Sequence, residues 1–180
     1  EIIKIAQNPD HFAFLSAFKD RCRIVCGDGR RMLEQAPAQY YNAVIIDAFS
    51  SDSIPVHLLT REALAIYSEH LTADGSIIFH ISNRYIDLKP ALANLSMNSG
   101  FQALHALDRE FDKAAPENFE RNVSEYVVFT RSPEMAAGLK KDTAITWQDL
   151  TASGDSRDNV AGQAWTDDDS SLFPLLTIFR

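Results

Sequence analysis

Acidic residues follow two apolar runs of this chain, at positions where a strand would end. Asp47 comes directly after the run Ala43–Ile46, and Asp28 stands on a glycine turn after the run Arg23–Cys26. In open α/β sheets, ligands bind outside the carboxyl ends of the strands, so we expect both acids to face one crevice. An acid on such a turn can accept hydrogen bonds from an exocyclic amine or a sugar hydroxyl. The alternative for each acid is a local role, in which it caps a turn or the start of a helix.

Strands that alternate with helices are expected to position these acids. Continuous apolar runs are typical of strands buried on both faces, as in a parallel sheet, and apolar residues at helical spacing indicate helices. The pattern predicts an α/β fold with a mostly parallel sheet, whose last strand is antiparallel to the one before it. The expected strands are 23–26, 42–47, 76–82, 101–107 and 125–130, and the expected helices are two short ones within 1–19, then 30–35, 61–71 after an N-cap at Thr60, 87–99 and 133–140.

Composition restricts the class of protein. The 180 residues suffice for one domain spanning 1–180, in which the Ser-, Gly-, Asp- and Asn-rich segment 151–164 is expected to be a mobile loop. The formal net charge of −8 argues against a nucleic-acid partner. Cys22 and Cys26 are predicted to be buried free thiols, which suits a reducing compartment. No apolar run approaches the ~20 residues of a membrane helix, so a cytoplasmic protein is expected. The histidines show no metal-ligand spacing, and no metal is expected.

Several motifs, in order along the chain, resemble the spermidine/spermine synthase family. They are Gly-Asp-Gly-Arg at 27–30, Val-Ile-Ile-Asp-Ala-Phe-Ser-Ser-Asp-Ser-Ile-Pro-Val-His-Leu-Leu-Thr at 44–60, Phe-His-Ile-Ser-Asn-Arg-Tyr at 79–85 and Trp-Thr-Asp-Asp at 165–168. The resemblance is closest to a bacterial branch that is often fused to a membrane transporter-like segment. It implies a Rossmann-like, S-adenosylmethionine-dependent methyltransferase fold. It also implies transfer of an aminopropyl group from decarboxylated S-adenosylmethionine to a diamine such as putrescine.

The same resemblance implies roles for individual acids. Asp28, between Gly27 and Gly29, matches the family's acid that contacts the adenine. Asp47 matches the acid that binds and deprotonates the attacking amine, and Asp52 matches a second acid that helps to hold the diamine. A primary amine has a pKa of roughly 10 to 10.5 and is protonated at pH 7, so a carboxylate base suits the reaction. The expected partners are amine and nucleoside substrates, without a permanently bound cofactor.

Further residues are candidates for substrate contact, and most of them have a structural alternative. His57 lies at the mouth of the loop after the predicted strand 42–47, and His80 lies in the strand 76–82. For His80 the alternative is a buried histidine next to a polar loop at 83–85. Trp165 and Asp168 belong to a segment that is expected to close over the site, with the tryptophan on the ligand and an acid facing the amine. Their alternative is a helix N-cap with a core tryptophan.

Two departures from the family leave other functions open. Ala48 and Phe49 lengthen the loop between the two acids Asp47 and Asp52, which changes how these acids lie. The family's glycine-rich first loop and ribose-binding acid have no counterpart here, so we expect an N-terminally truncated domain with bare sheet edges. Such a chain is expected to be marginally stable or paired with another, for example as a homodimer, and tethered to the inner membrane in a full-length protein. A methyltransferase that uses S-adenosylmethionine and a non-catalytic nucleoside-binding domain are the alternative functions.

Overall fold

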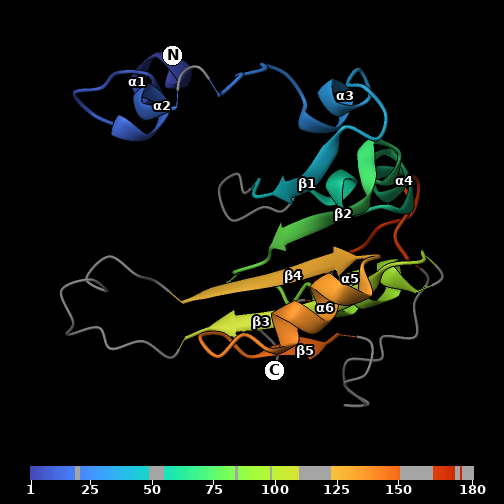
Figure 1. The fold of residues 1–180 in the computed structure, drawn as a ribbon. Coiled ribbons are helices and arrows are strands. Elements are labelled where there is room, and N and C mark those ends of the chain that lie inside the picture. The colour runs from blue at the N-terminus through green and yellow to red at the C-terminus, as the bar shows by residue number, and fades with distance from the viewer. Residues whose placement is uncertain are drawn as a thin grey trace. The chain divides into compact units, whose positions relative to one another are not determined.

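The computed structural model describes residues 1–18, 21–48, 55–83, 85–97, 99–109, 123–150, 164–172 and 175, and it is drawn in Figure 1. The chain divides into two compact units, Glu1–Met32 and Leu33–Arg180. The first unit contains α1 (Ile2–Ala6) and α2 (Ala13–Ala17), which confirms the two short helices expected there. The helix α3 (Gly29–Leu33) begins in the first unit.

The strand expected at 23–26 is not formed. Ile24 and Val25 are 40% and 54% exposed, and the structure assigns these residues to no sheet. A short apolar segment gains strand structure only from a neighbouring strand that pairs with its backbone, and the described residues supply none here. Cys22 and Cys26 are free and exposed, so the prediction of buried thiols is wrong for the same reason.

The second unit is built on a mixed five-stranded sheet with the order β1-β2-β4-β3-β5 (Figure 1). β1 pairs parallel with β2, whereas β4 runs antiparallel to both of its neighbours, β2 and β3, and β5 runs antiparallel to β3. β1, β2 and β3 therefore share one direction, and the antiparallel β4 fulfils the prediction for the last clear strand. The bounds are β1 Tyr41–Ile46, β2 Leu71–His80, β3 Gln102–Asp108, β4 Ser124–Thr130 and β5 Trp147–Asp149.

β2 begins earlier than the sequence predicts. Tyr41 pairs with Leu71, but Ala43 pairs with Ser76, so several extra residues of β2 lie opposite a single residue of β1. The Asp74-Gly75 pair, for which the sequence predicts a turn, falls inside this bulge. The chain therefore leaves the preceding helix directly into the strand.

Helices cover both faces of the sheet. They are η1 (Val56–Leu58), α4 (Arg61–His70), α5 (Lys89–Ser96) and α6 (Pro133–Lys140). Leu64 and Tyr67 of α4 and Leu92 of α5 join one core cluster with Phe79 and Phe129, whose rings meet edge to face at 5.1 Å between centroids. Successive strand residues point to opposite faces, so α4 and α5 lie on the face of the odd-numbered residues of β2 and β4.

The helix α6 covers the other face. The Met135 sulfur lies 2.9 Å from the Ser76 hydroxyl of β2 and 3.8 Å from the Thr130 hydroxyl of β4. Ser76 and Thr130 pair across these two strands, and both are buried. The middle of the sheet is thus enclosed on both faces.

β1 is the open edge of this sheet. Among the described residues β1 pairs only with β2. Val44 and Ile46 pack against the core cluster, but Ile45 on the opposite face is 65% exposed. The prediction that this apolar run is buried on both faces is therefore wrong for one face.

Candidate functional site

Asp47 stands at the carboxyl end of β1, beside the end of β2. Because Ile46 pairs with Phe79, the next residues of the two parallel strands, Asp47 and His80, come side by side. The His80 Nδ1 atom lies 2.8 Å from Asp47 Oδ1. A carboxylate only accepts hydrogen bonds, so Nδ1 carries the proton and donates it to Asp47.

A continuous chain of hydrogen bonds holds this pair. The His80 Nε2 atom lies 2.7 Å from the Ser82 hydroxyl oxygen, which accepts the backbone N–H of Glu125 at 2.8 Å. With its proton on Nδ1, the neutral ring accepts the Ser82 hydroxyl proton at Nε2. The His80 ring also stacks on Tyr126, 4.9 Å between centroids and 24° between planes. The Asp47–His80–Ser82 chain therefore fixes both the tautomer and the orientation of the imidazole.

The carboxylate of this chain is accessible from solvent. The Asp47 side chain is 62% exposed and that of His80 is 24% exposed. Behind them, the cavity bounded by Ile46, Phe79 and Leu88 holds only about 20 Å³, too little for a substrate. A ligand would therefore meet Asp47 from the solvent side, at the sheet edge where β1 and β2 end.

A larger hollow of about 420 Å³ opens on the other side of Ser82. Asn83, Leu107, Arg109 and Glu125 are among the residues that line it, from the ends of β2 and β3 and the start of β4. It lies at the same edge of the sheet, because β4 runs opposite to β2 and β3. Ser82 thus contacts both this hollow and the histidine that holds Asp47.

Glu125 is the centre of a compact ion cluster at this edge. Its Oε1 atom accepts hydrogen bonds from His105 Nε2 at 2.7 Å and Lys89 Nζ at 3.2 Å, and Lys89 also lies 3.0 Å from Asp87. Burial alone would raise the pKa of Glu125, but the His105 hydrogen bond and the Lys89 charge outweigh it and lower that pKa. Burial likewise lowers the pKa of Lys89, but Asp87 and Glu125 outweigh it, so that pKa is raised.

Sequence reasoning missed Ser82 and Glu125. Glu125 offered a signal, because it is an acid at the head of the otherwise apolar run 126–129. Ser82 offered only its position, two residues after His80 on the strand end, where the extended chain returns a side chain to the same face. For His80 the sequence favoured a buried histidine, but its side chain is partly exposed and bonded to Asp47.

The residues predicted to bind the nucleoside belong to the first unit. Asp28 Oδ1 accepts the backbone N–H of Arg31 at 3.0 Å, so Asp28 caps the start of α3. This is the local role that the sequence analysis gave as the alternative for Asp28. Gly27 has φ +147°, and a Cβ there would lie 2.9 Å from Met32 Cγ. Nothing lies within 4 Å of the corresponding position at Gly29. Contact of these residues with adenine stays a prediction.

The segment 164–172 is held at the N-terminus of α4. The Trp165 carbonyl accepts the Arg61 backbone N–H at 2.8 Å, and Trp165 packs against the core cluster. The Thr60 hydroxyl donates to Asp167 Oδ1 at 2.8 Å while it accepts the N–H of Ala63. Of the structural alternative for this segment, Trp165 packs against the core, but residues 164–172 form no helix and bond instead to the N-cap of α4.

Three candidates for substrate contact stay predictions. His57 is an exposed residue of η1, and Asp168 is exposed in the segment 164–172. Asp52 and most of the loop 151–164 lie outside the described residues, as does Arg84. Within the described ranges, no three His, Cys, Asp or Glu side chains are placed to hold a metal ion. No helix in this part of the chain combines the length and apolar character needed to cross a membrane.

Comparison with known proteins rests on solved structures. No protein-family model and no curated protein matches the chain. The chain aligns with a probable spermidine synthase from Corynebacterium glutamicum with a TM-score of 0.56 and 18% identity, over 89% of this chain and 62% of that one. This chain has a Rossmann-like fold of the S-adenosylmethionine-dependent methyltransferase type. At this identity the likeness shows the fold, and the chain spans 62% of the length of the Corynebacterium protein.

Two further structures align less well. Spermidine synthase from Thermotoga maritima has a TM-score of 0.46 and 16% identity, over 73% of this chain and 42% of that one. A SAM-dependent methyltransferase from Archaeoglobus fulgidus has a TM-score of 0.44 and 14% identity, over 68% of this chain and 72% of that one. Neither alignment is close enough to carry an argument about this chain.

Proposed function

We propose that this chain is an aminopropyltransferase domain of the spermidine synthase type, which moves an aminopropyl group from decarboxylated S-adenosylmethionine to a diamine such as putrescine. The observation that carries the proposal is the Asp47 carboxylate. It is exposed at the carboxyl end of β1 and bonded to His80 at 2.8 Å. The Rossmann-like fold and the motifs at 44–60 and 79–85 support it.

In the proposed reaction, Asp47 binds the attacking ammonium group and takes a proton from it. The free amine nitrogen then attacks the aminopropyl carbon bonded to the sulfonium sulfur, a C–N bond forms and the C–S bond breaks. Methylthioadenosine leaves as a neutral thioether. Asp47 supplies a base where the amine, with a pKa of roughly 10 to 10.5, arrives protonated. General base catalysis of this kind contributes typically ~10²–10⁴ in rate.

The remaining residues of the Asp47–His80–Ser82 chain have a positioning role in this proposal. The His80 Nδ1–H occupies Oδ1 of Asp47 and fixes the carboxylate plane, so that the second oxygen faces the amine. Asp28 is proposed to contact the adenine and Asp52 the second ammonium group of the diamine, both by the resemblance alone. His57, Trp165 and Asp168 are proposed to contact the substrate on the same basis.

The test is calorimetric titration of the chain with decarboxylated S-adenosylmethionine and with S-adenosylmethionine, followed by an assay for methylthioadenosine with putrescine. We expect the decarboxylated form to bind more tightly, and Asp28→Ala to weaken it. Asp47→Asn should leave nucleoside binding intact and lower turnover by about 10² or more. Asp74→Asn, the same change at an exposed residue of β2, is the matched control.

Different outcomes lead to different conclusions. Turnover that is unchanged in Asp47→Asn would remove Asp47 from the proposed role. Preference for S-adenosylmethionine and transfer of its methyl group would identify a methyltransferase instead. Nucleoside binding without any product would identify a binding domain.

A further inference from the structure

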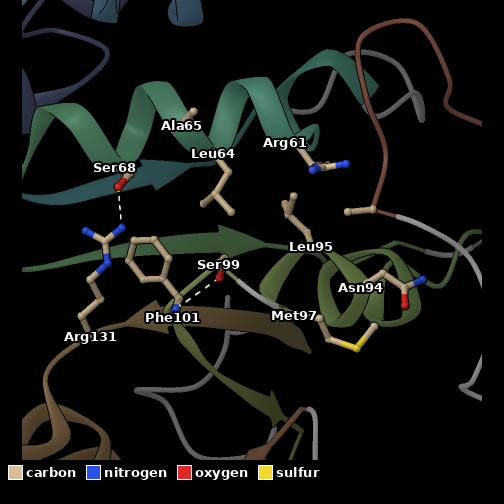
Figure 2. A pocket seen from close by; sticks show the side chains of 11 residues that line it. Arg61, Leu64, Ala65, Ser68, Asn94, Leu95, Met97, Ser99, Phe101 and Arg131 are labelled. Atoms are coloured by element: carbon tan, nitrogen blue, oxygen red, sulfur yellow. Dashed lines mark hydrogen bonds between the residues drawn. The ribbon is translucent and has the colours of Figure 1, made fainter.

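A second hollow lies between α4 and α5, with residues distinct from the Asp47–His80–Ser82 chain. We call it the α4–α5 pocket; Arg61, Leu64, Ser68, Leu95, Phe101 and Arg131 line it, with others (Figure 2). Its volume is about 490 Å³. Pockets that bind small molecules typically measure ~300–1,000 Å³, so this one is large enough for a ligand of its own.

The middle of the α4–α5 pocket is apolar. Leu64, Leu95 and Phe101 are exposed by only 7%, 3% and 7%, yet all three contribute to the wall. Figure 2 shows their side chains between the two arginines, with Leu64 descending from α4. These side chains would shield an apolar ligand body from water, which is the main source of affinity in such sites.

The charged groups of this pocket have one sign. Arg61 and Arg131 line it, and no acidic residue does within the described part of the chain, although the whole chain has a formal charge of −8. A surface that gathers positive charge in an acidic protein favours an anionic ligand by long-range attraction. This observation distinguishes the pocket from the sheet edge at Asp47, where the exposed group is a carboxylate.

Arg131 is held in place for such a ligand. Its guanidinium carbon lies 4.1 Å from the centroid of the Phe101 ring, and its Nη2 donates to the Ser68 hydroxyl at 2.5 Å. A guanidinium has five N–H donors, and Ser68 uses one of them. A stacked and partly bonded guanidinium loses little freedom when it binds a carboxylate through two parallel hydrogen bonds.

Arg61 occupies the opposite end of the pocket. Its backbone N–H bonds to Trp165, but its guanidinium forms no hydrogen bond or ion pair with any other described residue. Ser68, the partner of Arg131, is seven positions after Arg61 in α4, which corresponds to roughly 10 Å along the helix. The apolar wall therefore runs between two cationic ends (Figure 2).

We propose that the α4–α5 pocket binds an elongated organic acid, with its acidic group on Arg131 and its apolar body along Leu64, Leu95 and Phe101. Arg61 adds attraction from the far end. This site is separate from the proposed transferase site and does not depend on it. The shape and charge fit a linear or aromatic carboxylate better than a polyamine, which both arginines would repel.

The experiment is a titration followed by amide ¹H–¹⁵N NMR, with octanoate as the anionic probe and 1-octanol as its uncharged match. We expect octanoate to shift the amides of Ser68, Leu95 and Phe101. Arg131→Gln should weaken the binding of octanoate about tenfold and leave the binding of 1-octanol unchanged. Arg61→Gln should weaken the binding of octanoate by a smaller factor. Arg31→Gln, the same change at an exposed residue of α3, should have no effect.

Other results would overturn the proposal. Octanoate that binds Arg131→Gln as tightly as the wild type would exclude Arg131 as its anchor. Octanol that binds as tightly as octanoate would show a merely apolar hollow, and shifts confined to other residues would place the ligand elsewhere. Arg131 is exposed, so its variant is expected to fold, and an unchanged spectrum without ligand verifies this. Arg131→Lys retains the charge without the planar donors and should fall between the wild type and Arg131→Gln.

Discussion

The hydrogen bonds of His80 determine which atoms of Asp47 remain for chemistry. Asp47 accepts the Nδ1 proton at one oxygen, and Ser82 occupies Nε2, so the imidazole has no free nitrogen to take a substrate proton. In the proposed reaction the base is therefore the Asp47 carboxylate, and His80 positions it. A histidine acting as base would need an open Nε2 toward the substrate.

This arrangement predicts the tautomer of His80. In ¹⁵N NMR spectra of the histidine side chains at neutral pH, we expect His80 to carry its proton on Nδ1, because Asp47 can only accept a hydrogen bond. Ser82→Ala should leave Nδ1 protonated and change the Nε2 signal. Asp47→Asn should remove the preference, because an amide can face the ring with either its donor or its acceptor. A proton found on Nε2 in the wild type would contradict the hydrogen-bond chain.

At the scale of the elements, α4 begins where two distant segments of the chain meet. Thr60 is 1% exposed, and its hydroxyl accepts from Ala63 and donates to Asp167. Glu62 in the first turn accepts the backbone N–H of Asp167. The cap therefore joins the segment 164–172 to α4, the helix that lines one side of the α4–α5 pocket.

Removing this cap should destabilise the protein measurably. Thr60→Ala loses both hydrogen bonds of the hydroxyl, and N-cap substitutions of this kind cost about 0.5–2 kcal/mol. Thr60→Ser retains the hydroxyl and should lose less. Urea unfolding followed by circular dichroism measures both. Equal stability of the two variants would show that the lost methyl group, and not the hydroxyl, matters.

The Glu125 cluster predicts a pH-dependent contribution to stability. In the folded state, His105 and Lys89 lower the pKa of Glu125. The ionised Glu125 carboxylate therefore stabilises the fold at a pH above its pKa in the unfolded chain, and this contribution is lost as the pH falls through the lower pKa of the folded state. Glu125→Gln should therefore cost about 1–3 kcal/mol near pH 7, and the difference from the wild type should shrink below about pH 4.5. Glu69→Gln, at an exposed residue of α4, is the control. A difference that stays constant down to pH 3 would contradict this assignment.

The helices were predictable wherever local signals mark their ends. Thr60 and Ser132 accept hydrogen bonds from Ala63 and Met135 as N-caps, and the helix expected at 133–140 has those bounds in α6. The strand expected at 23–26 could not be judged in the same way, because strand formation depends on a partner elsewhere. Side-chain partners on different strands, such as Asp47 for His80, depend on strand register, which no local pattern encodes.

At the scale of the whole molecule, the sheet is enclosed in its middle and open at β1. The residue pairs Val44–Ile77 and Ile45–Ile78 are neighbours in the ladder between β1 and β2. Ile77 is fully buried, whereas Ile45 is 65% exposed on the opposite face. An open strand edge with an exposed apolar residue favours pairing with another chain, so the expectation that this chain is paired with another is testable at this position.

The matched substitutions Ile45→Ala and Ile77→Ala test whether this face is free. Ile77→Ala should cost about 2–5 kcal/mol, because it leaves a cavity in the core. Ile45→Ala should change the free energy of unfolding by no more than about 0.5 kcal/mol, as at other exposed positions. Both values come from urea unfolding at several protein concentrations. A large cost for Ile45→Ala that grows with concentration would show that a second copy covers β1, because burial in an interface makes stability depend on mass action.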